Sequence, residues 1–364
     1  MLLDVPTKVL DDVPFQAKRL CRGRSLVTCA DGTHYIAQGP SIVRTLDDGR
    51  TWRHCARISL SPARRVVGMS RLASRLLRQE FRALGVLSNG GLIASGRHGV
   101  YYSAPGEQHM APSRIDTGRQ KLFPPLTITV GPNDRVLWSE YNSNPFHGNP
   151  VRVFVSDDGG RHFDVGHVFA ANDIKHLHNL VFDPVLRKYW VLAGDWEHEP
   201  GIGLLGEDLK DCEWVRRGEQ KYRTVDVFDF GDRLIYGMDS DLEPNAVFSL
   251  DKATGDVRRL CELEGSCIYS CRCGPWYVIS TTVEPSKVNR SRHAALYLSR
   301  DGEQWRSVYR IEKDRWDDRY FQYGSLILPR GASPRENLFY SGQSLKGIDG
   351  QLFAADLSAY AGRI

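Results

Sequence analysis

The chain has 364 residues, 41% of them hydrophobic, and a formal net charge of +4. It is therefore long enough to bury a large core, and neither its composition nor its charge is that of a disordered protein. No apolar stretch approaches the roughly 18 residues that span a bilayer, and no nucleic-acid-binding motif occurs. Arginine makes up 37 of the 48 basic residues. Its planar fork suits carboxylates, sulfates and phosphates, which is consistent with an acidic partner, and a bias in genome composition would give the same excess.

The N-terminal residues 1–6 lack the basic segment and apolar core of a secretory signal. The eight cysteines lie mostly in apolar runs, and Cys271 and Cys273 alternate along one face of an expected strand, which favours a buried core over a zinc site. We therefore expect a reduced, cytoplasmic protein.

Short β runs separated by turns recur about every 40 to 50 residues, which is typical of a β-propeller. The repeats are expected to begin near residues 25, 81, 126, 176, 222, 268 and 323. The sequence therefore predicts an all-β protein, a seven-bladed propeller of four-stranded antiparallel blades forming one domain over 1–364. Six or eight blades would follow if the second or fifth repeat is misread.

Three turns share one pattern of residue types: 45–52, 156–163 and 299–305. In each, a β run ends at Ser or Thr, an Asp follows two residues later, a Gly turns the chain and an aromatic residue opens the next run. Asp and Ser/Thr side chains bond nearby backbone groups and Gly supplies positive φ. The third copy is one residue shorter, between Asp301 and Trp305. These turns are expected to join the third and fourth strands of their blades.

Two segments fall outside the repeats. The last repeat is one strand short, while residues 7–21 precede the first repeat, so we expect this N-terminal strand to close the ring and remove an exposed edge. Residues 62–84 have the apolar spacing of an amphipathic helix inserted between the first two blades. Its basic face would be solvated beside the propeller, or would contact a partner or membrane.

Propeller geometry sorts the candidate site residues. The start of each first strand and the end of each second strand share one face, opposite the three turns, and polar residues gather at those positions. A concave site with a few charged groups is the usual place for a ligand. The catalytic candidates are Glu140, His178, Asp195, Arg223, Asp239 and Tyr323. The substrate-binding candidates are Arg97, Tyr141, Asn142, Trp196, His198 and Gln322.

His176 and His178 are the sharpest local element. Residues i and i+2 of a strand point to the same face, so both imidazoles would face the funnel. They would either bind a divalent metal together, with Gln322, Asp195 or Glu140 completing the site, or place one imidazole as a general base.

The turn pattern resembles the Asp box, or bacterial neuraminidase repeat. The stretches 139–145, 176–184, 190–195, 222–223 and 237–239 resemble bacterial Asp-box proteins described as sialidase-like. This resemblance implies a propeller and suggests a carbohydrate ligand. The Phe/Tyr-Arg-Ile-Pro motif of true sialidases has no counterpart here. The plan also resembles seven-bladed polysaccharide lyases, in which histidines and a glutamine hold a metal; His176, His178 and Gln322 would correspond.

These observations predict a carbohydrate-active enzyme that acts on an acidic oligosaccharide or polysaccharide. In a lyase, Arg223 or Arg97 would neutralise the uronate carboxylate, His178 would remove the α-proton and Tyr323 would protonate the leaving oxygen. In a glycoside hydrolase, Glu140 with Asp195 or Asp239 would be the acid and base. The alternatives are a non-catalytic glycan- or protein-binding propeller and a scaffold that binds through the basic helix.

Overall fold

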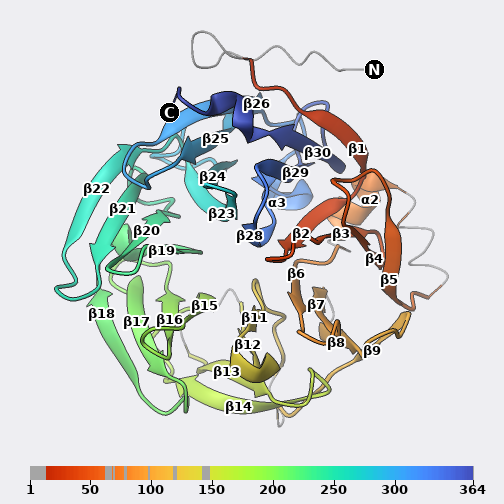
Figure 1. The fold of residues 1–364 in the computed structure, drawn as a ribbon. Coiled ribbons are helices and arrows are strands. Elements are labelled where there is room, and N and C mark those ends of the chain that lie inside the picture. The colour runs from red at the N-terminus through yellow and green to blue at the C-terminus, as the bar shows by residue number, and fades with distance from the viewer. Residues whose placement is uncertain are drawn as a thin grey trace.

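The structure is a computed structural model that describes residues 14–61, 68, 70–77, 80–96, 99–117, 121–141 and 148–363. Within these residues the fold is nearly all β, with two short helices, α2 (Arg71–Leu76) and α3 (Asp318–Phe321). Figure 1 shows groups of strands arranged in chain order around a central axis, with α3 close to the axis.

Consecutive strands form antiparallel groups of four. The first two groups are β2 (Arg24–Thr28), β3 (His34–Gln38), β4 (Ser41–Thr45) and β5 (Arg53–Ile58), then β6 (Ala83–Val86), β7 (Leu92–Gly96), β8 (Gly99–Ser103) and β9 (His109–Pro112). The next two are β11 (Thr129–Val130), β12 (Val136–Ser139), β13 (Val151–Ser156) and β14 (His162–Phe169), then β15 (Leu177–Asp183), β16 (Lys188–Ala193), β17 (Gly201–Gly206) and β18 (Cys212–Arg217).

The remaining groups follow the same order. They are β19 (Phe228–Asp229), β20 (Arg233–Gly237), β21 (Ala246–Asp251) and β22 (Val257–Glu262), then β23 (Ser266–Cys273), β24 (Trp276–Val283), β25 (His293–Ser299) and β26 (Arg306–Glu312), then β27 (Gly324–Ile327), β29 (Asn337–Gln343) and β30 (Gln351–Asp356). Two short strands lie outside the groups: β10 (Arg114–Ile115) and β28 (Arg330–Ser333). Parallel pairs such as β28 with β2 and β23 link groups to one another, and no sheet in the described ranges closes on itself.

The N-terminal strand β1 (Lys18–Arg22) pairs antiparallel with β30, near the other end of the chain. Lys18 lies opposite Ala354, and the register shifts between Arg19 and Cys21. Figure 1 shows the two strands side by side. Strand β1 thus becomes the fourth strand of the group that contains β27, β29 and β30, and the part of the expected 7–21 strand before residue 14 lies outside the described residues.

Packing between neighbouring groups makes the core. One cluster joins Val153 of β13 to Val191 of β16, and the next joins Trp190 of β16 to Tyr236 of β20. A strand buried on both faces places alternate side chains in two different clusters, as Trp190 and Val191 do. Each large apolar side chain buried in this way contributes about 1.5–3 kcal/mol, so each group depends on both of its neighbours.

The three related turns lie between the third and fourth strands of their groups, as the sequence predicts. In each, the glycine N–H donates to the Ser or Thr hydroxyl: Gly49 to Thr45, Gly160 to Ser156 and Gly302 to Ser299. The hydroxyls in turn donate to the Asp carboxylates two residues on. These bonds satisfy the backbone of a tight turn, which explains the repeated residue types.

The helix expected over 62–84 is shorter in the described residues. Helix α2 covers Arg71–Leu76, with Ser70 as its N-cap, whereas Ala83 and Leu84 belong to strand β6. Its basic face is also not simply solvated, because Arg75 is 2% exposed. Residues 62–67, 69 and 78–79 lie outside the described residues. No helix in the described ranges is long and apolar enough to cross a membrane.

Candidate functional site

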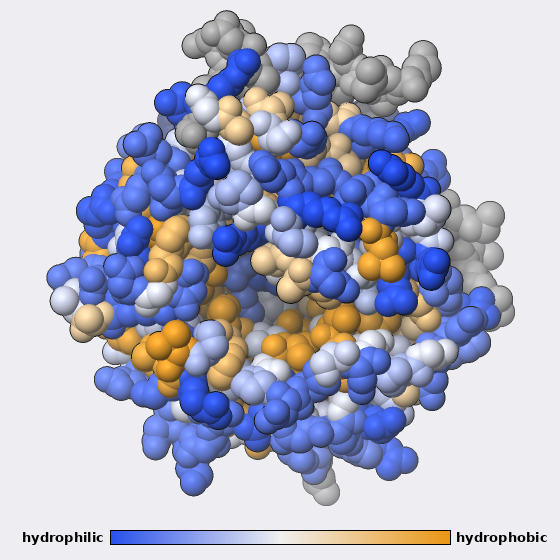
Figure 2. Space-filling view, viewed as in Figure 1, coloured by the Kyte–Doolittle hydropathy of each residue, from blue (hydrophilic) through white to orange (hydrophobic). Residues whose placement is uncertain are grey.

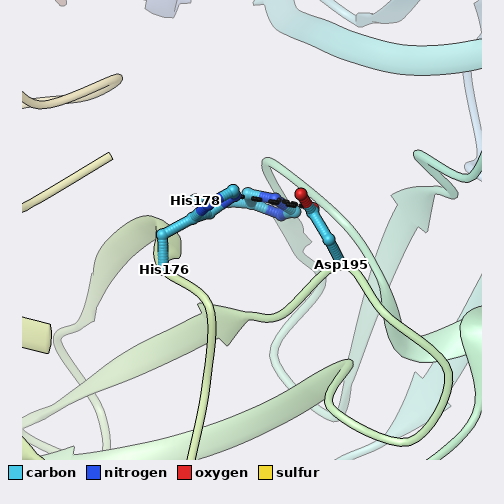
Figure 3. A group of neighbouring side chains, drawn as sticks. All are labelled: His176, His178 and Asp195. Carbon is cyan, nitrogen blue, oxygen red and sulfur yellow. Dashed lines mark hydrogen bonds and ion pairs between the residues drawn. The ribbon is translucent and has the colours of Figure 1, made fainter. Parts of the chain in front are cut away.

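Three of the predicted side chains meet where β15 begins and β16 ends. His176 and His178 come from the start of β15, and Asp195 follows β16; Figure 3 shows all three side chains pointing toward one another. All three are buried. The Asp195 Oδ1 atom lies 2.9 Å from His178 Nε2 and 3.5 Å from His176 Nε2. A β-bulge between Leu177 and Asn179 lies beside this cluster.

Two cationic side chains also bind Asp195. Lys175 Nζ lies 2.6 Å from Oδ2, and Arg223 Nε lies 3.2 Å from Oδ1. Burial raises the pKa of Asp195, but the charges and hydrogen bonds of His176 and His178 outweigh burial and hold the pKa well below its usual value. Asp195 is therefore an ionised carboxylate at the centre of a cluster of donors.

Both ring nitrogens of His178 have partners. Its Nδ1 lies 2.9 Å from the carbonyl oxygen of Thr224, which only accepts, so Nδ1 is the donor in this bond. Its Nε2 lies 2.9 Å from Asp195 Oδ1. As the general base of a lyase, His178 would have to exchange its bond to Asp195 for one to the substrate.

The same three residues also satisfy the geometric requirements of a divalent metal. One ligand atom from each of His176, His178 and Asp195 lies within 4.8 Å of the others. Metal-bound histidines usually donate their second ring N–H to a carbonyl or carboxylate, as His178 does to Thr224. A cation there would bind the Nε2 atom of His178 and share Asp195 with Lys175 and Arg223. We find no ligand role for Gln322 or Glu140 beside this cluster.

Asp239 and Glu284 form a second, acidic part of the site. Burial raises the pKa of Asp239 to about 7; Arg223 opposes the rise and Glu284 adds to it. Burial likewise raises the pKa of Glu284, against Arg223 and a hydrogen bond from Ser266. Asp239 Oδ1 is buried without a hydrogen-bond partner among the described residues. The negative charge of Glu284 thus disfavours ionisation of Asp239.

Aromatic side chains line the same site. The Tyr141 ring lies over His176, with centroids 4.3 Å apart. Burial, with Asp195 and Asp239 adding, raises the pKa of Tyr141. Tyr323 is 40% exposed, and burial of its phenol, with Glu284 adding, raises its pKa to about 12. Gln322, between α3 and Tyr323, has φ 72° and ψ 157°, a backbone region that non-glycine residues seldom adopt.

Glu140 is held by partners away from the histidine cluster. It forms a buried two-point ion pair with Arg152, at 2.8 and 2.7 Å, and accepts from the backbone N–H of Phe123. Both of its oxygens are therefore engaged. A carboxylate held in this way stabilises the fold, and the acid and base pair that includes Glu140 stays a prediction.

The remaining candidates lie farther out or outside the described residues. Trp196 is 46% exposed and lies close to Lys175, whose Nζ is 5.5 Å from the indole centroid. His198 is exposed, and its Nδ1 lies 3.1 Å from the carbonyl oxygen of Gly218, which follows β18. Arg97 and Asn142 lie outside the described residues.

Sequence reasoning missed two charged members of the site. Lys175 directly precedes the His176–His178 pair, and its position next to a predicted first strand was a usable signal. Glu284 follows the second strand β24 by one residue, and its position just past the end of a predicted second strand was a usable signal.

Comparisons with known proteins were made on sequence and on structure. No family model matches the sequence, and no curated protein does. A solved chain of the mitotic checkpoint complex aligns with a TM-score of 0.59 at 7% identity, covering 97% of this chain and 97% of that chain. The extracellular domain of a hybrid two component system from B. thetaiotaomicron aligns with a TM-score of 0.58 at 9% identity, covering 94% of this chain and 42% of that chain.

An ancestral GH74 enzyme aligns with a TM-score of 0.51 at 10% identity, covering 93% of this chain and 46% of that chain. The chain has a β-propeller-like fold. It spans about two fifths of the length of the B. thetaiotaomicron chains that it matches. At such low identities the likeness concerns the fold alone, and the same fold hosts both enzymes and binding proteins.

Proposed function

We propose that the protein is a carbohydrate-active enzyme that hydrolyses an acidic glycan at the site around Asp195 and Asp239. The observation that carries this proposal is the coupled pair Asp239 and Glu284 beside the guanidinium of Arg223. A buried carboxyl group with a pKa of about 7 is protonated for about half of the time at neutral pH and can act as a general acid.

The roles follow from charge. Asp239, as the acid, would protonate the glycosidic oxygen, and Glu284 would receive the proton of the attacking water, as paired carboxyl groups do in most glycoside hydrolases. Arg223, 8% exposed on its side chain and 2.7 Å from Asp241, would bind a carboxylate of the sugar. Elimination through His178 is less well supported, because both of its ring nitrogens are already engaged.

A divalent cation held by His176, His178 and Asp195 would polarise a carboxylate or hydroxyl oxygen of the sugar. The tyrosines that flank the site are Tyr141 above the histidines and Tyr323 beside Glu284; the first would stack on a sugar ring and the second would bond a hydroxyl group. We also infer that the strand groups are the blades of a seven-bladed propeller closed by β1, related to Asp-box proteins through its three turns.

The test is a panel of acidic oligosaccharides, incubated with and without a chelator. Release of new reducing ends without ultraviolet absorbance from an unsaturated uronate supports hydrolysis. Asp239→Asn should lower kcat by about 10²–10⁴-fold, the usual contribution of a general acid. Activity that is lost on chelation and restored by a divalent metal would indicate that the reaction needs a cation held by His176, His178 and Asp195.

Asp232→Asn, at an exposed aspartate of the same strand group, is the matched control and should leave kcat unchanged. Binding of the oligosaccharides without any turnover by the wild-type protein would overturn the enzymatic proposal in favour of a glycan-binding propeller. Unsaturated products would overturn hydrolysis in favour of elimination.

A further inference from the structure

A cavity of about 640 Å³ lies between helix α2 and the strands β2, β3, β29 and β30. These strands belong to the first and the last strand groups, and Figure 1 shows β2 close to the axis. The charged residues of its described lining are Arg22, Arg24, Arg71, Glu80 and Asp349, and the uncharged polar ones are Gln38, Ser74, Ser341 and Gln351. The cavity is large enough for a sugar residue of a bound ligand and is separate from the cluster around Asp195.

Arg24, at the start of β2, is one of the three arginines that line this cavity. Its side chain is 11% exposed. One terminal nitrogen donates to Gln343 Oε1 at 2.6 Å and the other to the Tyr269 hydroxyl at 3.1 Å, and both of these partners are neutral. Its Nε has no partner among the described residues. The nearest carboxylate oxygen, on Glu80, is 3.9 Å away, beyond hydrogen-bond distance, and Glu80 is already bound by Arg71.

Other buried arginines in the described ranges are paired differently. Arg152 meets Glu140 at 2.7 Å, Arg75 meets Asp314 at 2.5 Å and Arg223 meets Asp241 at 2.7 Å. A buried charge is expensive unless a counter-charge bonds it. Arg24 is thus a largely buried guanidinium that retains unused donors and no bonded counter-ion at the wall of a cavity.

Contacts connect this cavity to the proposed site. Gln343, which accepts from Arg24, donates through Nε2 to the carbonyl oxygen of Tyr323 at 3.2 Å. The phenol of Tyr323 in turn lies close enough to Glu284 for the negative charge of Glu284 to raise the pKa of Tyr323. Two hydrogen bonds, from Arg24 to Gln343 and from Gln343 to Tyr323, thus join the wall of the cavity to the proposed site.

We propose that the cavity beside Arg24 is a second subsite, which binds a carboxylate-bearing sugar residue of an oligomeric ligand. The unused guanidinium N–H groups would donate to the carboxylate as charge-assisted hydrogen bonds, and the ligand would supply the missing counter-charge. This inference rests on the proposed function in one respect, the acidic glycan. It adds that the ligand carries at least two acidic residues, one at Arg223 and one at Arg24.

The test measures binding of trigalacturonate by isothermal titration calorimetry, with all proteins in the Asp239→Asn background so that no cleavage competes with binding. Arg24→Gln should weaken binding by about 10- to 100-fold, the usual effect of losing a hydrogen bond to a charged group. Arg24→Lys keeps the positive charge but lacks the forked guanidinium group, so its affinity should lie between those of the parent protein and Arg24→Gln. Methyl-esterified trigalacturonate, which is neutral, should bind the parent protein more weakly than trigalacturonate binds Arg24→Gln, because the ester loses the carboxylate contacts at both Arg223 and Arg24.

Arg53→Gln, at an exposed arginine of the outer strand β5, removes the same charge elsewhere and should leave affinity unchanged. Thermal unfolding checks that Arg24→Gln is folded; if it is not, Arg24→Lys carries the comparison. Equal affinity of both Arg24 variants and the parent, equal binding of the ester, or no binding of the acid would each overturn the subsite. The binding result is independent of turnover, so failure of the hydrolase proposal is detected separately.

Discussion

Asp239 is the residue whose ionisation most directly couples the site to stability. Its pKa is about 7 in the folded chain and near 3.9 when unfolded, so the folded state holds an extra proton between these values. The stability that depends on this proton of Asp239 is fully present below about pH 4 and is lost as the pH rises through 7. Asp239→Asn stays neutral throughout. The variant should therefore gain about 2–3 kcal/mol of unfolding free energy over the wild type between pH 5 and pH 8.

Urea unfolding at the two pH values measures this difference. Asp232→Asn, whose side chain is 73% exposed, provides the control and should show almost no change with pH. A difference between wild type and Asp239→Asn that is the same at pH 5 and pH 8 would contradict the raised pKa.

Asp195 makes the opposite kind of contribution, because it is the shared counter-charge of several donors. Asp195→Asn would leave Lys175 and His178 facing a neutral amide in a buried site. Removing one partner of a buried ion pair costs about 3–5 kcal/mol, so we expect a loss of this size in urea unfolding at pH 7. Asp157→Asn, which removes a 64% exposed partner of Arg135, should cost less than about 1 kcal/mol. Equal losses for the two variants would show that Asp195 is not the centre of the network.

At the level of single residues, the sequence could locate the site but could not assign its chemistry. His176, His178, Asp195, Arg223 and Asp239 come together because strand ends are fixed by propeller geometry. The roles of the carboxyl groups depend on partners that are far apart in sequence. Nothing local distinguishes Glu140, which binds Arg152 twelve residues on, from Glu284, whose environment comes from three other strand groups.

At the level of secondary-structure elements, hydrogen bonds from helix α2 fix the position of the segment that carries Tyr323. Arg75 donates from Nε and a terminal nitrogen to the carbonyl oxygen of Phe321, at 2.9 and 2.6 Å, and the Ser344 hydroxyl donates to the same oxygen. Arg71 binds both oxygens of Asp349. These bonds hold the strained residue Gln322 and therefore the position of Tyr323.

Arg75→Gln should release this segment. We expect a loss of about 3–5 kcal/mol in unfolding free energy, because Asp314 is left without its buried partner. If Tyr323 bonds the substrate, KM for an acidic oligosaccharide should also rise. Arg319→Gln, on α3 but 77% exposed, is the control and should change the stability by less than about 0.5 kcal/mol. A stability loss without any change in KM would confine Arg75 to a structural role.

The sequence predicted this helix but not the contacts that its arginines make. The apolar spacing around Leu72 and Leu76 indicated a helix, and the arginines between them indicated a solvated face. Which of these arginines becomes buried depends on Asp314, Asp349 and Phe321, more than 230 residues later in the chain. Helical periodicity reports one face of a helix and cannot identify partners from distant loops.

For the whole molecule, the order of strands was predictable because turns and β runs repeat along the chain. The three related turns were placed correctly between third and fourth strands. The pairing of β1 with β30 also agrees with the expected shortage of one strand in the last repeat. The short strands β10 and β28 were not predicted, since two to four residues that pair with distant strands leave no periodic signal.

The proposed closure of the ring by β1 makes a prediction for the intact chain. A truncation that removes residues 1–22 would expose the ladder of β30 and the apolar contacts of Leu20, which packs in a cluster with Ile36 and Leu352. Open strand edges pair with other molecules, so this truncation should lower Tm by several degrees and promote aggregation on size-exclusion chromatography; a loss of about 2 kcal/mol corresponds to roughly 4–8 °C or less in a chain of this size. A truncation of residues 1–13 keeps β1 and serves as the control. If both truncations behave like the full chain, β1 does not close the propeller.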